Sequence, residues 1–201
     1  MAQHTLRLPD PLHQQLSNLA AERSVSVNQL VTTLVERAVD DHYVNRAFVD
    51  HCAQRTIHPT VTPTTWELTT ATMLDAARAC LPNTPVAWRN KAALTPTLNQ
   101  VNDLLRHNHP HSTVRAAGLL LAGCASFFPF TENNAGVGIR SALALMNVYR
   151  LATIAPRDTD LASLRALARA ATHAGEPEPA VVDTISRDLT SLLASPLPDC
   201  F

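Results

Sequence analysis

Apolar and polar positions change their period once within the first forty residues. The stretch "TLRL" at 5–8 alternates between polar and apolar residues, as a strand does, and Pro9 ends it. After Pro9 the apolar residues follow a helical period, first at 12, 16, 19 and 20 and then again from Val27 onward. Asp10 is the expected N-cap of the first helix and Ser26 that of the second. The pattern predicts a short strand followed by two helices.

Two short helices and one strand cannot bury their own apolar faces. Leu6 and Leu8 share one face of the predicted strand, while Thr5 and Arg7 share the other. A single strand has no partner, so we expect a homodimer in which two copies pair antiparallel above the four helices. Gln3, Thr5 and Arg7 then point outward from a ribbon of a size that enters the major groove of double-stranded DNA.

Residues 3–40 resemble the ribbon-helix-helix regulators of the Arc/MetJ/CopG type, a family that includes many antitoxins. The resemblance rests on "TLRLP", on the leucines of the first helix and on "SVSVNQLV". It implies that Gln3, Thr5 and Arg7 read the bases of an operator. It also implies that Ser26, Val27 and Asn28 hold a phosphate with the backbone amides of a helix N-terminus, where N–H groups lack intrahelical partners. Ser24 stands where many members have glycine, so we expect a strained left-handed turn there.

A second interpretation of the same segment is an arm that dimerises the protein without touching DNA. Net charge does not distinguish the two, because Arg7, Arg23 and Arg37 balance Asp10, Glu22 and Glu36 over residues 1–39. Binding to DNA therefore depends on specific contacts and backbone amides. It does not depend on a broad positive field.

The next stretch, residues 41–63, is expected to be a helix extension followed by a linker. The apolar phase shifts at Val39, Tyr43 and Phe48, which predicts a continuing or third helix to about residue 54. The segment "IHPTVTP" at 57–63 has no helical period. Thr64 and Glu67 have the spacing of a capping box. We therefore expect a first domain over 1–40 and a second over 64–201.

Residues 64–201 show helical patterns and no strand pattern, so the fold class is expected to be mainly α. Thr95 and Pro96 are the predicted cap and first residue of one helix. The stretch "STVRAAGLLLAGCASFF" is apolar nearly all round, which is typical of a central helix surrounded by others. Gly118 and Gly123 would let neighbouring helices approach it closely. An all-α domain of this size is more than DNA binding needs, and we expect it to sense an effector, oligomerise or bind a partner.

Composition narrows the possible function classes. Hydrophobic residues make up 46% of the chain, charged residues 16%, and the formal net charge is −1, so no general attraction to nucleic acid or membrane is expected. The longest apolar run has 13 residues, too few to span a bilayer. The four cysteines lack paired spacing, and the first residues do not resemble an export signal. We expect reduced thiols and a cytoplasmic protein.

The string "RHNHPH" at 106–111 is the strongest metal-like pattern. His107, His109 and His111 could offer imidazoles to a transition metal. Pro110 indicates a solvated loop, and we predict no metal site. No nucleophile triad, zinc spacing or nucleotide-binding fingerprint is present in the sequence, so we predict no catalytic residue, no cofactor and no enzyme activity.

The segment "FFPFTENNAGVGIRSALALM" at 127–146 is the strongest candidate for ligand chemistry. Gly136, Gly138 and Arg140 could hold a phosphate if the glycines form a loop before a helix that opens at the arginine. The segment also resembles the Fic/Doc nucleotidyl and phosphoryl transferases. Their motif is matched in order by Pro129, Phe130, Glu132 and Asn134. Phe128 replaces the catalytic histidine, Asn133 replaces a glycine, and Arg140 comes late, which implies a non-catalytic relative. The alternative is a helix–helix loop plugged by "FFPF".

Taken together, the sequence predicts a homodimeric DNA-binding regulator that represses its own or a neighbouring promoter. The resemblance implies an antitoxin-like protein with a toxin as its partner. The alternative is a non-catalytic Fic/Doc-like or toxin-like helical module that uses the N-terminal arm only for dimerisation.

Overall fold

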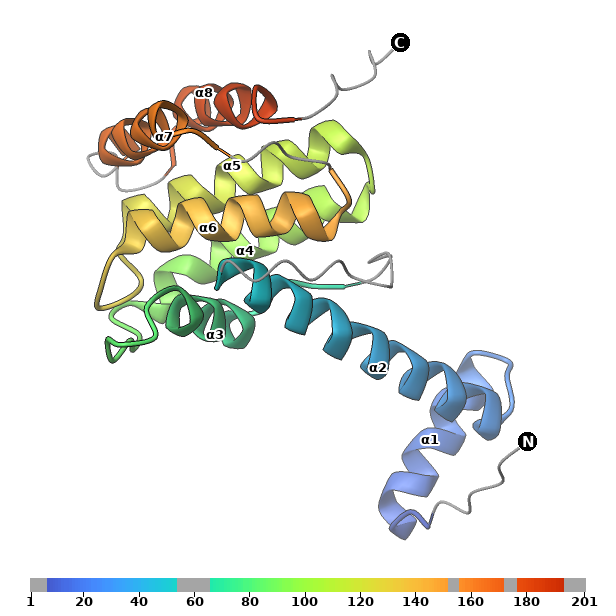
Figure 1. The fold of residues 1–201 in the computed structure, drawn as a ribbon. Coiled ribbons are helices and arrows are strands. Elements are labelled where there is room, and N and C mark those ends of the chain that lie inside the picture. The colour runs from blue at the N-terminus through green and yellow to red at the C-terminus, as the bar shows by residue number, and fades with distance from the viewer. Residues whose placement is uncertain (1–6, 54–65, 152–155, 172–176, 194–201) are drawn as a thin grey trace. The chain divides into compact units, whose positions relative to one another are not determined.

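The computed structural model describes residues 7–53, 66–151, 156–171 and 177–193. The chain divides into two compact units, Met1–Asp40 and Asp41–Phe201. The described residues contain eight helices, which are labelled in Figure 1: α1 (Asp10–Glu22), α2 (Val27–Cys52), α3 (Thr70–Cys80), α4 (Lys91–Arg106), α5 (Pro110–Phe127), α6 (Asn134–Val148), α7 (Asp158–Ala171) and α8 (Pro179–Thr190). The division between the units falls within α2, so each unit is described by itself.

The N-terminal unit contains α1 and the first part of α2. Asp10 is the first residue of α1 and not its cap; Pro9 holds the cap position, and no side chain bonds to the start of this helix. Ser26 caps α2 as predicted, because its Oγ accepts a hydrogen bond of 3.2 Å from the amide of Gln29. Gln29 in turn accepts from the Ser26 amide at 3.0 Å, which completes a capping box. Between the helices Ser24 has a φ of 55°, the left-handed turn that the sequence predicted.

The predicted N-terminal strand is wrong. Arg7 and Leu8 are neither strand nor helix, and the part of the chain that the structure describes contains no strand. Its sheet-like features are single bridges, among them the one between Trp88 and Phe130. A strand requires a neighbouring backbone, and alternation of polar and apolar residues along four positions does not supply one. Residues 1–6 lie outside the described residues.

In the second unit α5 is the central helix. It packs against α4, α6, α7 and α8. Figure 1 shows α7 and α8 side by side on one side of α5 and α3 on the other, where α3 contacts α4 and α6. Every residue of α5 from Thr113 to Ser126 is buried except Arg115, so the helix is covered on all sides. The all-round apolar pattern of this helix therefore predicted its central place, and a mainly α fold is confirmed.

Glycines set how closely α5 approaches its neighbours. A Cβ at Gly123 would lie 2.6 Å from Cγ2 of Thr97 on α4. A Cβ at Gly118 would lie 2.4 Å from Oγ of Ser186 on α8. Gly138 on α6 faces α5 in the same way, because a Cβ at this position would lie 3.0 Å from the Cβ of Cys124. Such separations are below normal van der Waals contact, so a side chain at any of these positions would force a neighbouring group to shift.

The chain enters α3 through an extended segment that one asparagine holds in place. The side chain of Asn102 on α4 accepts from the Leu68 amide at 2.8 Å and donates to the Leu68 carbonyl at 3.1 Å. The helix begins only at Thr70, and Thr69 caps it by accepting from the Thr72 amide. The capping box predicted at Thr64 and Glu67 is therefore wrong for Glu67, which lies in this extended segment; Thr64 lies outside the described residues.

Two more helix starts differ from the sequence prediction. Asn90 caps α4, so this helix begins at Lys91 and contains Pro96 in its interior. Thr95 is thus not a cap. Pro110 is the first residue of α5, and Nδ1 of His109 accepts from the amide of His111 at 3.3 Å. The loop predicted at 106–111 is therefore shorter than expected: residues 107–109 connect the two helices, while Arg106 ends α4 and Pro110 begins α5.

Candidate functional site

The predicted base-reading residues precede α1. Arg7 is exposed, two residues before Pro9. Gln3 and Thr5 lie outside the described residues. The structure thus leaves the Arg7 side chain accessible to solvent, next to the first helix of the N-terminal unit.

The predicted phosphate contacts occupy the N-terminus of α2. The capping box uses the amides of Ser26 and Gln29. Val27 and Asn28 have no hydrogen-bond partner for their amides among the described residues, as expected for the first turn of a helix. Ser26 and Asn28 are exposed, and Val27 is partly so. Two amides at the positive end of the helix dipole therefore face solvent and suit a phosphate oxygen.

Most apolar side chains of the helices in the N-terminal unit are at least partly exposed. Of residues 7–40, only Ala20 and Leu30 are buried. The exposed large hydrophobic residues of this unit have 40% to 54% of their surface accessible: Leu12, Val25, Leu34, Val35 and Val39. Two helices with so small a core need a further surface to cover them.

The predicted phosphate loop has another geometry. Gly136 and Gly138 lie inside α6, which begins at Asn134 and is capped by Asn133, whose side chain accepts from the Gly136 amide at 3.2 Å. Gly138 is buried at the crossing with α5. Arg140 comes almost two turns into the helix, and its Nη1 donates to the carbonyl oxygen of Cys80 at 3.0 Å.

A cavity of about 340 Å³ lies between α6 and α7. Its lining includes two residues of the predicted loop, Gly136 and Arg140. Arg165 and Arg169 of α7 also line it; both side chains are exposed, and the two residues lie one helical turn apart. The remaining lining residues are mostly apolar: Asn133, Ala135, Ile139, Leu143, Pro156 and Leu161. The cavity thus combines three guanidinium groups with an apolar wall.

Arg165 and Arg169 are not among the site residues predicted from the sequence. The signal was present, since their spacing of four residues in "LRALARAA" places two cations on one face of a helix. That pattern is common on solvated helices. Only the packing of α7 against α6 adds Arg140 to the same space.

Three buried thiols lie near one another, and the charge of Arg140 acts on two of them, Cys52 and Cys80. Cys52, Cys80 and Cys124 are free, and the Cys80 thiol donates to the carbonyl oxygen of Cys52 at 3.5 Å. A hydrogen bond from the Cys52 side chain lowers the pKa of Cys80, and the charge of Arg140 acts in the same direction. Burial raises the pKa of Cys52 well above its usual value and that of Cys124 to about 12. The cluster therefore holds one thiol whose pKa is lowered beside two whose pKa is raised.

The segment that resembled the Fic/Doc motif is a packed connection between α5 and α6. Phe130 is fully buried and stacks on Trp88 with ring centroids 4.8 Å apart. The side chain of Asn134 accepts from the Phe130 amide at 2.8 Å and donates to its carbonyl at 3.0 Å. Phe128, which replaces the catalytic histidine, is 41% exposed. These contacts agree with the alternative interpretation, a helix–helix loop plugged by an aromatic ring.

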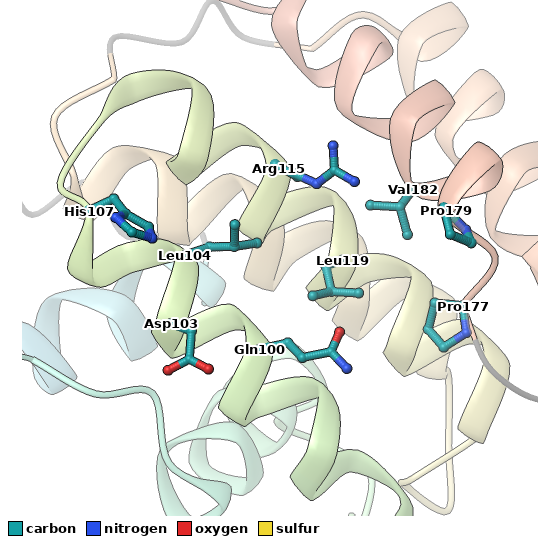
Figure 2. A pocket seen from close by; sticks show the side chains of 9 residues that line it. All are labelled: Gln100, Asp103, Leu104, His107, Arg115, Leu119, Pro177, Pro179 and Val182. Carbon is teal, nitrogen blue, oxygen red and sulfur yellow. The ribbon is translucent and has the colours of Figure 1, made fainter.

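A second pocket, of about 350 Å³, is shown in Figure 2 and lies between α4, α5 and the start of α8. Leu104 and Leu119 lie in its middle, and Asp103 and Arg115 lie at its edges. Asp103 already pairs with Arg106, and Arg115 pairs with Asp183 at 3.0 Å. Because its charges are satisfied by neighbours, this pocket suits a neutral, partly apolar group.

The three histidines do not form a metal centre. His109 and His111 stack with ring centroids 5.4 Å apart. Within the described residues, no cluster of three or more histidine, cysteine, aspartate or glutamate side chains could hold a metal ion.

The N-terminal end of the chain matches a known protein family. Residues 4–35 match the HicB family, whose members are antitoxins of toxin–antitoxin pairs. The match covers about a sixth of the chain. No curated protein and no solved structure matches the chain. None of the helices that the structure describes combines the length and the hydropathy needed to cross a membrane.

Proposed function

We propose that this chain is an antitoxin-like regulator that binds operator DNA as a homodimer through residues 1–40. The observation that carries the proposal is the match of residues 4–35 to the HicB family. The matched segment lies within the unit whose helices leave their apolar faces in solvent.

The exposed apolar face supports the homodimer. Leu34, Val35 and Val39 lie on one side of α2, each at least 40% exposed. Burying the exposed half of each such side chain contributes roughly 1 kcal/mol, so a surface that covers this face in both copies helps to offset the cost of association. A second copy of the same unit presents the same residues, as a twofold interface requires.

The polar groups near this face support DNA binding. Arg7 is exposed before α1, and arginine forms the commonest specific contact with guanine in the major groove. The amides of Val27 and Asn28 suit a backbone phosphate, with Ser26 beside them. We propose that Gln3, Thr5 and Arg7 contact bases and that the start of α2 fixes the register on the phosphates.

The helical unit that follows is proposed to be regulatory and not catalytic. It offers a surface for a partner protein such as a toxin and a cavity for a small ligand. This division of roles separates DNA binding, in residues 1–40, from regulation, in the unit from Asp41 onward.

The test of the homodimer compares Leu34→Asp with Thr33→Asp. Both variants add one negative charge to α2, but Thr33 is exposed and lies on the side of the helix roughly opposite the middle of the apolar face. Light scattering coupled to gel filtration should give twice the chain mass for the wild type and for Thr33→Asp, and the mass of one chain for Leu34→Asp. Operator binding should be lost in the Leu34 variant alone. A wild-type protein that runs with the mass of a single chain would refute the homodimer.

A further inference from the structure

Two of the buried cysteines lie in contact at the ends of two helices. Cys52 is the last residue of α2, and Cys80 is the last residue of α3. The Cys80 thiol donates to the Cys52 carbonyl oxygen at 3.5 Å, and the two side chains are hydrogen-bonded to each other. We infer that this pair is a site of oxidation by hydrogen peroxide, at which Cys80 is oxidised first and Cys52 then closes a disulfide with it.

Cys80 reacts first because it is the thiol whose ionised form is best stabilised, and the thiolate is the nucleophile. The hydrogen bond from Cys52 lowers the pKa of Cys80, and the charge of Arg140 acts in the same direction. Burial raises the pKa of Cys52 and that of Cys124. Exposure favours the same order, since 5% of Cys80 is accessible to solvent against 0% of Cys52 and Cys124.

Arg140 contacts Cys80 and also lines the cavity between α6 and α7. Its Nη1 donates to the Cys80 carbonyl oxygen at 3.0 Å, and its side chain forms part of the cavity wall. A cavity of about 340 Å³ admits hydrogen peroxide, which is little larger than water. An oxidant in this space is one side chain away from Cys80. Cys124, by contrast, lies in the middle of the central helix α5.

The reaction consumes two thiols and one peroxide. The Cys80 thiolate attacks one oxygen of the peroxide, the O–O bond breaks, and the leaving hydroxide takes up a proton to become water. Cys80 is then a sulfenic acid. The Cys52 sulfur attacks the sulfur of Cys80, the S–O bond breaks, and a second water leaves with the Cys52 proton. The thiols lose two electrons and two protons in all, and the peroxide is reduced to two molecules of water.

The first step prepares Cys52 for the second. Burial is the main cause of the raised pKa of Cys52, but the negative charge of the Cys80 thiolate adds to it. That charge disappears when Cys80 becomes a neutral sulfenic acid. The hydroxyl of Ser141 lies 3.9 Å from the Cys52 sulfur, and this hydrogen bond lowers the pKa of Cys52. Both effects favour the Cys52 thiolate that attacks in the second step.

The experiment treats the full chain with hydrogen peroxide, blocks the remaining thiols with iodoacetamide and maps the tryptic peptides by mass spectrometry. The four cysteines fall on four different tryptic peptides, residues 47–55, 79–89, 116–140 and 188–201. Without reductant, peptide 47–55 should be joined to peptide 79–89, and dithiothreitol should separate them. The oxidised protein should keep the mass of one chain on a denaturing gel. Preferred pairing with another cysteine peptide, disulfides between chains, or a Cys80 that stays reduced overturns the inference.

Variants separate the two steps. Cys52→Ser should stop the reaction at the sulfenic acid, which dimedone labels on Cys80, and Cys80→Ser should leave Cys52 reduced. Cys124→Ala is the matched control, because it removes a thiol of the same cluster and should still form the disulfide. In the wild type Cys80 should be oxidised roughly ten times faster than Cys124, or more. Dimedone labelling of Cys124 in place of Cys80 in the Cys52 variant overturns the order of the steps. None of these measurements involves DNA, so their outcome is independent of the proposed function.

Discussion

Nη1 of Arg140 donates a hydrogen bond of 3.0 Å to the backbone carbonyl oxygen of Cys80. The last carbonyl groups of a helix have no intrahelical partner, and the C-terminal end of its dipole is negative. The bond therefore satisfies the end of α3 with a cation from α6. The same guanidinium lowers the pKa of the Cys80 thiol and lines the cavity that faces α7.

Removal of this contact should destabilise the fold. Arg140→Ala leaves the Cys80 carbonyl without its donor, and we expect the free energy of unfolding to fall by about 1–2 kcal/mol. Arg140→Lys keeps a charge near the end of α3 and should lose less. Urea unfolding followed by circular dichroism measures both. Equal stability of Arg140→Ala and the wild type would show that the bond contributes nothing.

The three buried thiols should differ in reactivity. The hydrogen bond from Cys52 is the main cause of the lowered pKa of Cys80, whereas burial raises the pKa of Cys52 and Cys124. Since the thiolate is the reactive form, Cys80 should be alkylated at lower pH than the other two. Mass spectrometry after iodoacetamide treatment gives the rate for each thiol. In Cys52→Ala the pH dependence of Cys80 should move upward; Cys124 reacting as fast as Cys80 would contradict the account.

Alkaline solution should destabilise the protein. Burial raises the pKa of Cys124 to about 12 from an ordinary value of 9.0, and that of Tyr149 to about 12 from 10.0. A raised pKa in the folded state means that the stabilisation is complete below the ordinary value and is lost as pH rises toward the folded value. Unfolding free energy should therefore fall by about 2 kcal/mol between about pH 8 and about pH 10.5.

The variant Cys124→Ala tests which thiol is responsible. It removes the titrating group and should reduce the alkaline loss, even if the smaller side chain lowers stability at neutral pH. The loss between the two pH values is the quantity to compare, since the packing defect is present at both. An identical pH dependence in this variant would assign the loss to other groups.

The turn between α1 and α2 should be improved by glycine. Ser24 has a φ of 55°, a conformation that costs a residue with a Cβ about 1 kcal/mol. Ser24→Gly should raise the melting temperature, although the extra freedom of glycine in the unfolded chain reduces the gain. Ser26→Ala, which removes the cap of α2, should lower it by a comparable amount. A lower melting temperature for Ser24→Gly would contradict the strain.

The order of helices and the central place of α5 could be predicted from the sequence. Helical periodicity and an all-round apolar segment are local properties that packing preserves. The residues at which helices begin were harder to predict from the sequence. Local capping rules favoured Thr64 with Glu67, but Asn102 of another helix holds Leu68 in an extended segment. The same rules favoured Thr95 with Pro96, but Asn90 caps α4 earlier in the chain. A contact between residues 34 positions apart does not appear in a local pattern.

The candidate sites were predictable only in part. Arg140 was identified from its glycine-rich context, but Gly138 proved to be a packing residue against α5. Arg165 and Arg169 become site residues only because α7 packs against α6. The predicted strand failed for the related reason that pairing requires a second backbone, which a pattern of four residues cannot provide.

Sequence-selective DNA binding that depends on Arg7 is the central claim. Fluorescence anisotropy with DNA from upstream of the gene, beside an unrelated duplex and at two salt concentrations, measures it directly. Arg7→Ala should weaken operator binding by about 1–3 kcal/mol and reduce selectivity. Lys91→Ala, which removes one positive charge from the start of α4, should bind like the wild type. Equal weak binding to both duplexes, or no effect of Arg7→Ala, would contradict the proposed function.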